Sequence, residues 1–367
     1  MPFKPLNENT GLAIDGGGIK GLIVALALQS LESQLGTRLI DSPSIKVLAG
    51  TSTGAIISAG ICIGLSAKEI AAMYIRLGQT VFPQPPAWIP ANLIHIYTLI
   101  SGLFRASRFS SAAFKQVLLD VMGEITMGEL NERLKGKVTL IITAVDINER
   151  RTHFIKSTDP QDRDWKLWQA VMASSAAPTV LPVVLRDHPT RGRRYYTDGG
   201  VGSYTNPALV ATRELVEWRG YAPGTISVLS FGTGWVLESS FLKAHGAPDR
   251  WKILDWAQNA PMMIIGDGAR SQSLEIITNY VQRGMDFRRF QVAMDEDIGL
   301  DDASDAALAR LQELGEALGI RLQNNQHALS DLRFDPEGLI TAVRNYEASI
   351  ARTQAATKAI EGVSEKP

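Results

Sequence analysis

The chain has 367 residues, of which 45% are hydrophobic, 20% charged and 7% aromatic. This composition is that of a globular protein with a large core, and it excludes disorder over most of the chain. The formal net charge is -1, so the chain lacks the basic surplus with which proteins bind nucleic acids. We therefore expect no nucleic-acid partner. The length of the chain is compatible with one α/β domain that carries a helical appendage, and equally with two or three smaller domains.

Cys62 is the only cysteine, which excludes an intrachain disulfide and a cysteine-rich metal site and suits a reducing compartment. The N-terminus lacks the basic start and apolar stretch of a secretion signal. The apolar residues 47–65 contain polar and glycine positions that favour a strand, turn and helix over a membrane span. We expect a soluble, cytoplasmic protein that contacts membranes, if at all, only peripherally, and we expect neither a metal nor a cofactor.

The first predicted unit is a strand, a glycine loop and a helix. Residues 11–15 form a short apolar strand, and residues 19–35 show helical periodicity that ends at Gly36. Between them lies D-G-G-G-I-K-G, from Asp15 to Gly21. Consecutive glycines let backbone N–H groups point into one space, which suits an oxyanion or a phosphate. The loop lacks the features of a P-loop and of a dinucleotide fingerprint, but nucleotide binding and a purely structural turn stay open as alternatives.

The second unit places a serine between a strand and a helix. Residues 45–49 form a buried strand, residues 55–65 form a helix of small residues, and G-T-S-T-G lies between them, from Gly50 to Gly54. In this context G-x-S-x-G is the pattern of a nucleophile elbow, in which Ser52 takes a strained backbone conformation. Its hydroxyl would stand at the positive end of the helix. A plain glycine-bounded turn is the alternative, because the pattern also arises by chance.

Residues 82–108 are the least regular part of the chain. Four prolines precede an apolar stretch at residues 91–104. An irregular segment that carries such an apolar stretch is expected to form a lid or a membrane-facing cap. A helix packed on the core is the alternative.

The middle of the chain predicts further strands and an acidic motif. The predicted strands are residues 137–146, 152–156, 194–197 and 225–231, with a helix at residues 165–177. Strands that alternate with helices favour an α/β fold with a mostly parallel sheet in layers. Asp198, followed by Gly199 and Gly200, lies on a loop at a strand end, where function tends to collect. Asp198 is the predicted base for Ser52, and His245 is the alternative base in a Ser-Asp-His order.

The composition shifts near Gly299 toward Asp, Ala, Leu, Glu and Gln. Residues 303–323 and 336–356 have the pattern of two amphipathic helices, which we expect to pack against the sheet domain. The predicted division is 8–298 for the main domain, 299–360 for a C-terminal helical extension and 361–367 for a mobile tail.

Three separated motifs, D-G-G-G-x-x-G, G-x-S-x-G and D-G-G, occur in the order found in patatin-like phospholipases. Residues 173–178, A-S-S-A-A-P, also resemble the family's A-S-x-A-x-P segment, and Asn206-Pro207 resembles its continuation after the aspartate. The resemblance covers about residues 8–235. It implies a three-layer patatin-like sandwich and a phospholipase A type of hydrolysis, in which carboxylic esters of glycerophospholipids are cleaved through an acyl-enzyme.

The resemblance also implies roles for particular residues. Ser52 and Asp198 would form a catalytic dyad, with no histidine required, and Gly16, Gly17 and Gly18 would form the oxyanion loop. The motif residues around them are Asp15, Lys20, Gly21, Gly50, Gly54, Gly199 and Gly200. The implied partner is a phospholipid or another acyl ester.

The chain departs from the family pattern at a few positions. Lys20 stands where arginine is usual, residues 180–181 where aromatic residues are frequent, and Thr205 where an asparagine commonly precedes Asn206. These departures bear on acyl-chain and head-group preference more than on the chemistry. A ligand-regulated phospholipase effector and a catalytically silent lipid- or nucleotide-binding protein of the same fold are the alternative functions. Oligomeric state stays open.

Overall fold

The computed structural model describes residues 5–81, 111–178, 180–188 and 190–327. Its centre is an eight-stranded sheet in the order β5-β6-β3-β2-β1-β7-β9, with β4 paired to β3. The strands are β1 (Asn9–Ile14), β2 (Ile45–Thr51), β3 (Thr139–Asp146), β4 (Arg151–Lys156), β5 (Val184–His188), β6 (Gly192–Asp198), β7 (Ile226–Phe231) and β9 (Asp286–Phe290). A separate parallel pair consists of β8 (Trp235–Val236) and β10 (Ala293–Met294).

The middle of the sheet is parallel. β1 pairs with β2 and β7, β2 with β3, and β7 with β9, all in parallel, whereas β4, β5 and β6 join as antiparallel strands. Parallel strands covered on both faces are apolar throughout, and all but one residue of β2 are buried. The predicted α/β fold with a mostly parallel central sheet is confirmed.

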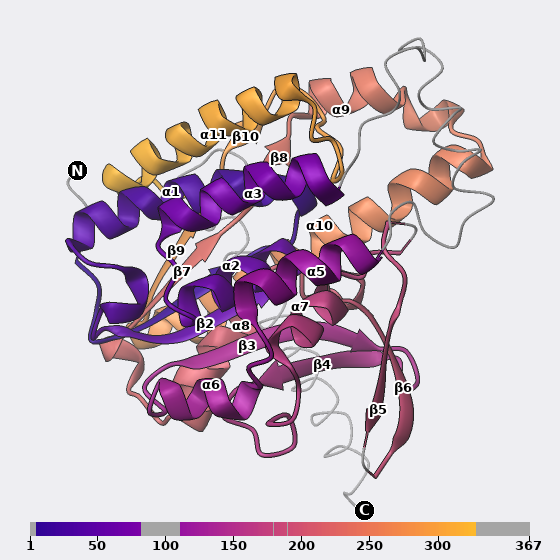
Figure 1. Ribbon diagram of the computed structural model, residues 1–367. Coiled ribbons are helices and arrows are strands. Elements are labelled where there is room, and N and C mark those ends of the chain that lie inside the picture. The colour runs from indigo at the N-terminus through magenta and orange to yellow at the C-terminus, as the bar shows by residue number, and fades with distance from the viewer. Residues whose placement is uncertain (1–4, 82–110, 179, 189, 328–367) are drawn as a thin grey trace, which may run out of the picture.

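Helices cover both faces of the sheet (Figure 1). They are α1 (Gly21–Leu35), α2 (Thr53–Cys62), α3 (Ala67–Val81), α5 (Ser111–Met122), α6 (Met127–Arg133), α7 (Leu167–Ser175), α8 (Ala208–Arg213), α9 (Glu238–His245), α10 (Ile253–Asn279) and α11 (Asp305–Gln323). One hydrophobic core contains side chains of α1, α2, α3, α5, α7 and α11, and a second one lies between the sheet and the pair α8 and α10. Two cores around one sheet make the three layers.

Local sequence signals set several helix ends. α1 ends at Gly36, which takes a left-handed conformation with φ of 66°, as glycine does at helix C-termini. α6 begins with a capping box, in which the Thr126 side chain accepts from the Glu129 N–H and Glu129 bonds back to Thr126. The Ser304 side chain accepts from Ala307 N–H at the start of α11.

Most predicted elements are present. The six predicted strands correspond to β1, β2, β3, β4, β6 and β7, and residues 303–323 correspond to α11, which packs on α1. The pattern did not predict β5, β9 or α10. The apolar stretch 91–104, the helix at 336–356 and the tail at 361–367 lie outside the described residues. No helix within the described part is long and apolar enough to cross a membrane.

Candidate active site

Ser52 lies in the sharp turn between β2 and α2. Its backbone has φ of 54° and ψ of -117°, which is a strained conformation for a residue with a side chain. The Ser52 N–H donates to Ser174 Oγ at 2.7 Å, and Ser174 is part of the A-S-S-A-A-P segment. The strain is therefore held in place by a neighbouring helix, and the hydroxyl stands at the N-terminus of α2.

Two glycines make this turn sterically possible. A Cβ on Gly50 would lie 2.1 Å from the carbonyl oxygen of Gly54, and a Cβ on Gly54 would lie 2.0 Å from the carbonyl oxygen of Ile14. Both obstacles are backbone atoms, which cannot rotate away as a side chain can. The glycines on either side of Ser52 are thus required by the close approach of β1, β2 and α2.

Asp198 is the last residue of β6 and lies opposite Ala144 of β3. It is 6% exposed, and its Oδ1 accepts from the Gly200 N–H at 2.7 Å. Burial raises the pKa of Asp198 to about 6, and hydrogen bonds from the Ser52 side chain and the Gly200 amide oppose that rise. The fold thus brings the Ser52 side chain close enough to Asp198 to lower its pKa, although the two residues are far apart in the chain.

The glycine loop passes beside the serine. A Cβ on Gly16 would lie 3.3 Å from Ser52 Cβ. The Gly16 N–H, however, donates to the Thr205 carbonyl at 3.0 Å, so this amide is already engaged. Within the described residues, the N–H groups of Gly17 and Gly18 have no acceptor. Of the three glycines predicted to bind an oxyanion, Gly17 and Gly18 are therefore the two whose N–H groups can donate a hydrogen bond to it.

The loop itself is fixed by contacts on both sides. Thr233 Oγ1 donates to the Gly16 carbonyl at 2.9 Å, and the Ile19 N–H donates to the Leu300 carbonyl at 2.9 Å. Gly18 has φ of 58°, and a Cβ there would lie 2.1 Å from the Leu300 carbonyl oxygen. The loop conformation therefore depends on residues that precede β8 and α11 and lie outside the motifs.

Asp15, the first residue of the motif, is buried and forms an ion pair. The Arg289 guanidinium donates to Asp15 Oδ1 at 2.7 Å and to Oδ2 at 2.5 Å. Burial raises the pKa of the Asp15 carboxyl, and the charge and hydrogen bonds of Arg289 oppose that rise. The ion pair therefore fixes the first residue of the glycine loop. The sequence did not indicate Arg289 as a site residue, because Arg289 and Asp15 lie 274 positions apart in the chain.

Lys20 and Gly21 are the last two residues of the glycine motif. Lys20 is buried, which lowers its pKa, while the charge of Asp297 acts in the opposite direction. A Cβ on Gly21 would lie 2.2 Å from Thr53 Oγ1, so this glycine lets α1 approach α2. The alternative base His245 hydrogen-bonds Asp297 at 2.9 Å and not Asp198.

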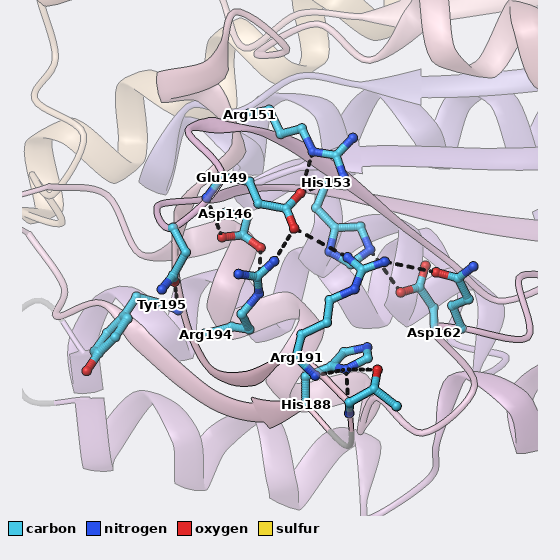
Figure 2. Close-up of polar contacts among 12 residues, drawn as sticks. Asp146, Glu149, Arg151, His153, Asp162, His188, Arg191, Arg194 and Tyr195 are labelled. Atoms are coloured by element: carbon cyan, nitrogen blue, oxygen red, sulfur yellow. Dashed lines mark hydrogen bonds and ion pairs between the residues drawn. The ribbon is translucent and has the colours of Figure 1, made fainter.

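A second polar cluster lies beside β6 (Figure 2). Arg194 contacts Asp146 at 3.3 Å and also Glu149, and the Tyr195 N–H donates to Asn148 Oδ1 at 2.9 Å. These contacts join β6, which ends in the candidate base, to the turn between β3 and β4. Asp146 and Glu149 pair with Arg194, and Asp162 pairs with His153 at 2.9 Å. No group of three or more metal-ligand side chains occurs in the described part of the chain.

An open cavity of about 700 Å³ lies between α10 and the loop after β6. Its walls include the apolar side chains of Leu209, Met263 and Ile264. Tyr204 also lines it, and the Tyr204 carbonyl accepts from Thr51 Oγ1 at 2.5 Å. The cavity is therefore separated from Thr51, the residue before Ser52, only by Tyr204.

Comparison with known proteins matches residues 12–212 to the model of the patatin-like phospholipase family. Patatin-05 from Solanum tuberosum is 28% identical over 356 residues, which cover 86% of this chain and 85% of that protein. Patatin-1-Kuras 2 from the same plant is 28% identical, with 86% and 88% covered. Among solved structures, VipD from Legionella pneumophila has a TM-score of 0.41 at 14% identity, with 88% of this chain and 68% of VipD covered. The type III effector ExoU, of Pseudomonas aeruginosa, has a TM-score of 0.35 at 13% identity, with 99% and 67% covered.

Proposed function

Because the chain belongs to the patatin-like phospholipase family, we propose that it hydrolyses acyl esters of glycerophospholipids through a dyad of Ser52 and Asp198. One observation carries this proposal: the serine of the strained elbow lies close enough to the buried Asp198 to lower its pKa, beside two glycine-loop amides that have no acceptor among the described residues. A nucleophile, its base and oxyanion donors are the three parts that acyl transfer requires.

In the first step the Ser52 hydroxyl attacks the ester carbonyl carbon and its proton passes to Asp198. The carbonyl oxygen becomes an oxyanion, which accepts from the N–H groups of Gly17 and Gly18. The tetrahedral intermediate then collapses, the C–O bond to the alcohol breaks, and Asp198 returns the proton to the leaving alkoxide. In the second step Asp198 deprotonates a water molecule, which attacks the carbonyl carbon of the acyl-enzyme. The bond between that carbon and Ser52 Oγ then breaks, Asp198 returns the proton to Ser52, and the fatty acid is released.

The environment of each group suits this chemistry. An aspartate at its ordinary pKa of about 3.9 is a weak base, whereas the pKa of Asp198 is raised to about 6. Ser52 is half-buried in its strained turn, and the positive end of α2 stabilises developing negative charge. The open cavity beside α10 offers an apolar wall for part of a lipid substrate.

The test is product analysis by mass spectrometry with mixed glycerophospholipids. Wild-type protein should release fatty acids and lysophospholipids, and Ser52→Ala and Asp198→Asn should release almost none. Ser58→Ala is a matched control, because Ser58 is a buried serine of α2 whose Oγ has no hydrogen-bond partner among the residues that the structure describes. A serine-reactive fluorophosphonate should label wild type and Ser58→Ala but not Ser52→Ala. Undiminished hydrolysis by Ser52→Ala would falsify the mechanism.

A further inference from the structure

We propose that Arg289 is a positioning residue, which holds the Asp15 carboxylate and thereby orients the Gly17 and Gly18 amides toward the oxyanion. The proposal rests on the proposed function, since it assigns those amides a task. Arg289 lies on β9, outside the segment that matches the family model, residues 12–212.

Arg289 reaches Asp15 across one intervening strand. β9 pairs with β7, where Arg289 lies opposite Ser230, and β7 pairs with β1, which ends one residue before Asp15. The guanidinium donates to both carboxylate oxygens of Asp15 and, at 2.7 Å, to Ser230 Oγ. A bidentate contact between an arginine and a carboxylate fixes orientation as well as distance. The arginine side chain is 8% exposed, so water cannot readily take over this role.

The same contacts continue to the other side of the loop. Ser230 Oγ donates to Asn206 Oδ1 at 3.1 Å, and Asn206 is fully buried. Its neighbour Thr205 accepts the Gly16 N–H at 3.0 Å. The first two loop residues, Asp15 and Gly16, are therefore both held by one buried network, which is anchored on β9.

Loss of the Arg289–Asp15 ion pair should slow the reaction because it shifts the Gly17 and Gly18 amides. The amides of Gly17 and Gly18 follow directly after the two anchored residues, and oxyanion donors work only when they are aimed before the reaction begins. A small displacement of such a group reduces turnover strongly, whereas ground-state binding of substrate need not change. We therefore expect an effect on kcat and little effect on KM.

Arg289→Lys tests this while it keeps the positive charge. Lysine offers a point charge instead of the planar fork, so the bidentate contact is lost. Arg288→Lys is the matched control: Arg288 is the preceding residue of β9 and its side chain is 1% exposed. It hydrogen-bonds Asp286 Oδ2 at 2.6 Å and the Pro5 carbonyl at 3.0 Å, and neither of these residues belongs to the loop.

The expected kcat of Arg289→Lys on a soluble ester is lower than that of wild type by about 10- to 100-fold, with KM within about threefold. Arg288→Lys should stay within about threefold of wild type in both constants. A trifluoromethyl ketone, which forms an oxyanion when a serine adds to it, should lose affinity for Arg289→Lys in parallel with kcat/KM. If Arg289→Lys does not fold, Asp15→Asn combined with Arg289→Gln removes both buried charges and should show the same kinetic loss.

Hydrogen exchange of the peptide 12–22 gives a readout that does not need turnover. Arg289→Lys should speed exchange in this peptide, and Arg288→Lys should leave it unchanged. Wild-type kinetics and exchange in Arg289→Lys, or equal losses in the two variants, would overturn the positioning role. A wild-type protein that hydrolyses no ester would refute the proposed function instead, and the exchange comparison would still decide whether Arg289 holds the loop.

Discussion

At the scale of single residues, the proposed base Asp198 has to combine burial, which raises its pKa, with a negative charge that can accept a proton. Burial raises its pKa to about 6, and only the ionised carboxylate can accept the serine proton. We predict that kcat/KM on a neutral ester is highest above pH 7 and falls as the pH drops through about 6, because that constant reports the free enzyme's base. A pH series from 5 to 8 measures this, with circular dichroism at each pH as the control for folding. Activity that stays constant down to pH 5 would contradict the assignment.

The buried Asp198 carboxylate should also lower the free energy of unfolding at neutral pH. Its pKa is raised from 3.8 to about 6, so between these values the folded state binds more protons than the unfolded state. The free energy of unfolding therefore falls as the pH rises through this window. Asp198→Asn avoids the buried charge, and we predict that it raises the free energy of unfolding at pH 8 by up to about 3 kcal/mol, with a gain that shrinks toward pH 5. Denaturant melts at the two pH values measure the difference. If Asp198→Asn had a lower free energy of unfolding than wild type at pH 8, the predicted gain in stability would be wrong.

At the scale of elements, the turn between β2 and α2 tolerates no Cβ at its second glycine. Gly54→Ala places a methyl group 2.0 Å from the Ile14 carbonyl oxygen, so β1 and α2 must separate. We predict a loss of several kcal/mol in the free energy of unfolding, as for other severe core changes, together with loss of activity. Gly266→Ala is the control, because Gly266 lies within α10 and a Cβ there meets nothing within 4 Å. That variant should gain about 0.5–1 kcal/mol from helix propensity. Equal stability of the two variants, measured by denaturant melts, would show that the turn can relax.

The sequence predicts those elements whose signal is local. β1 and β2 are apolar strands followed by glycine motifs, so both their position and their neighbouring turns follow from the pattern. β9 could not be found in this way, since D-F-R-R-F places two arginines in a buried strand. Arg288 and Arg289 are buried only because carboxylates compensate them, and the partner of Arg289 is Asp15, 274 positions away. β5 was missed for a different reason: three of its five residues are polar, as suits the edge strand of a sheet.

The candidate site shows the same division between local and distant information. The motifs indicate Ser52 and Asp198 from their places at strand ends, but their contact depends on the pairing of β6 with β3. The sequence also treats Gly16, Gly17 and Gly18 alike. The structure separates them, because Gly16 donates to the Thr205 carbonyl while the other two amides have no acceptor among the described residues.

At the scale of the whole molecule, the C-terminal helix α11 is part of the core that supports the site. α11 packs along α1, and α1 begins directly after the glycine loop. Leu311, Leu314, Leu318 and Leu322 of α11 are all buried in the same hydrophobic core as α1. The described part of the predicted C-terminal extension thus completes the layer of helices over this face of the sheet.

Small residues let the two helices approach so closely. A Cβ on Gly315 would lie 2.8 Å from Leu26 Cβ and 3.2 Å from the Ile23 carbonyl oxygen, both on α1. Gly315→Val should therefore push α11 away from α1, and we predict a loss of about 1–3 kcal/mol in the free energy of unfolding, as overpacking of a core costs. Helix propensity opposes this loss only slightly, because valine is a better helix former than glycine.

Glu316→Val is the matched control for this change. It introduces the same side chain one position further along α11, where the residue is exposed, so it shows what valine costs in this helix without the clash. Because glutamate is a better helix former than valine, a small loss is expected here. Denaturant melts of both variants separate the two effects, and the esterase activity of the folded Gly315→Val protein shows whether a shift of α1 reaches the glycine loop. If Gly315→Val were more stable than Glu316→Val, as helix propensity alone predicts, the close packing of α11 on α1 would not contribute to folding. If it were destabilised but fully active per folded molecule, the loop would be held by β9 and its arginine independently of the helix that follows it.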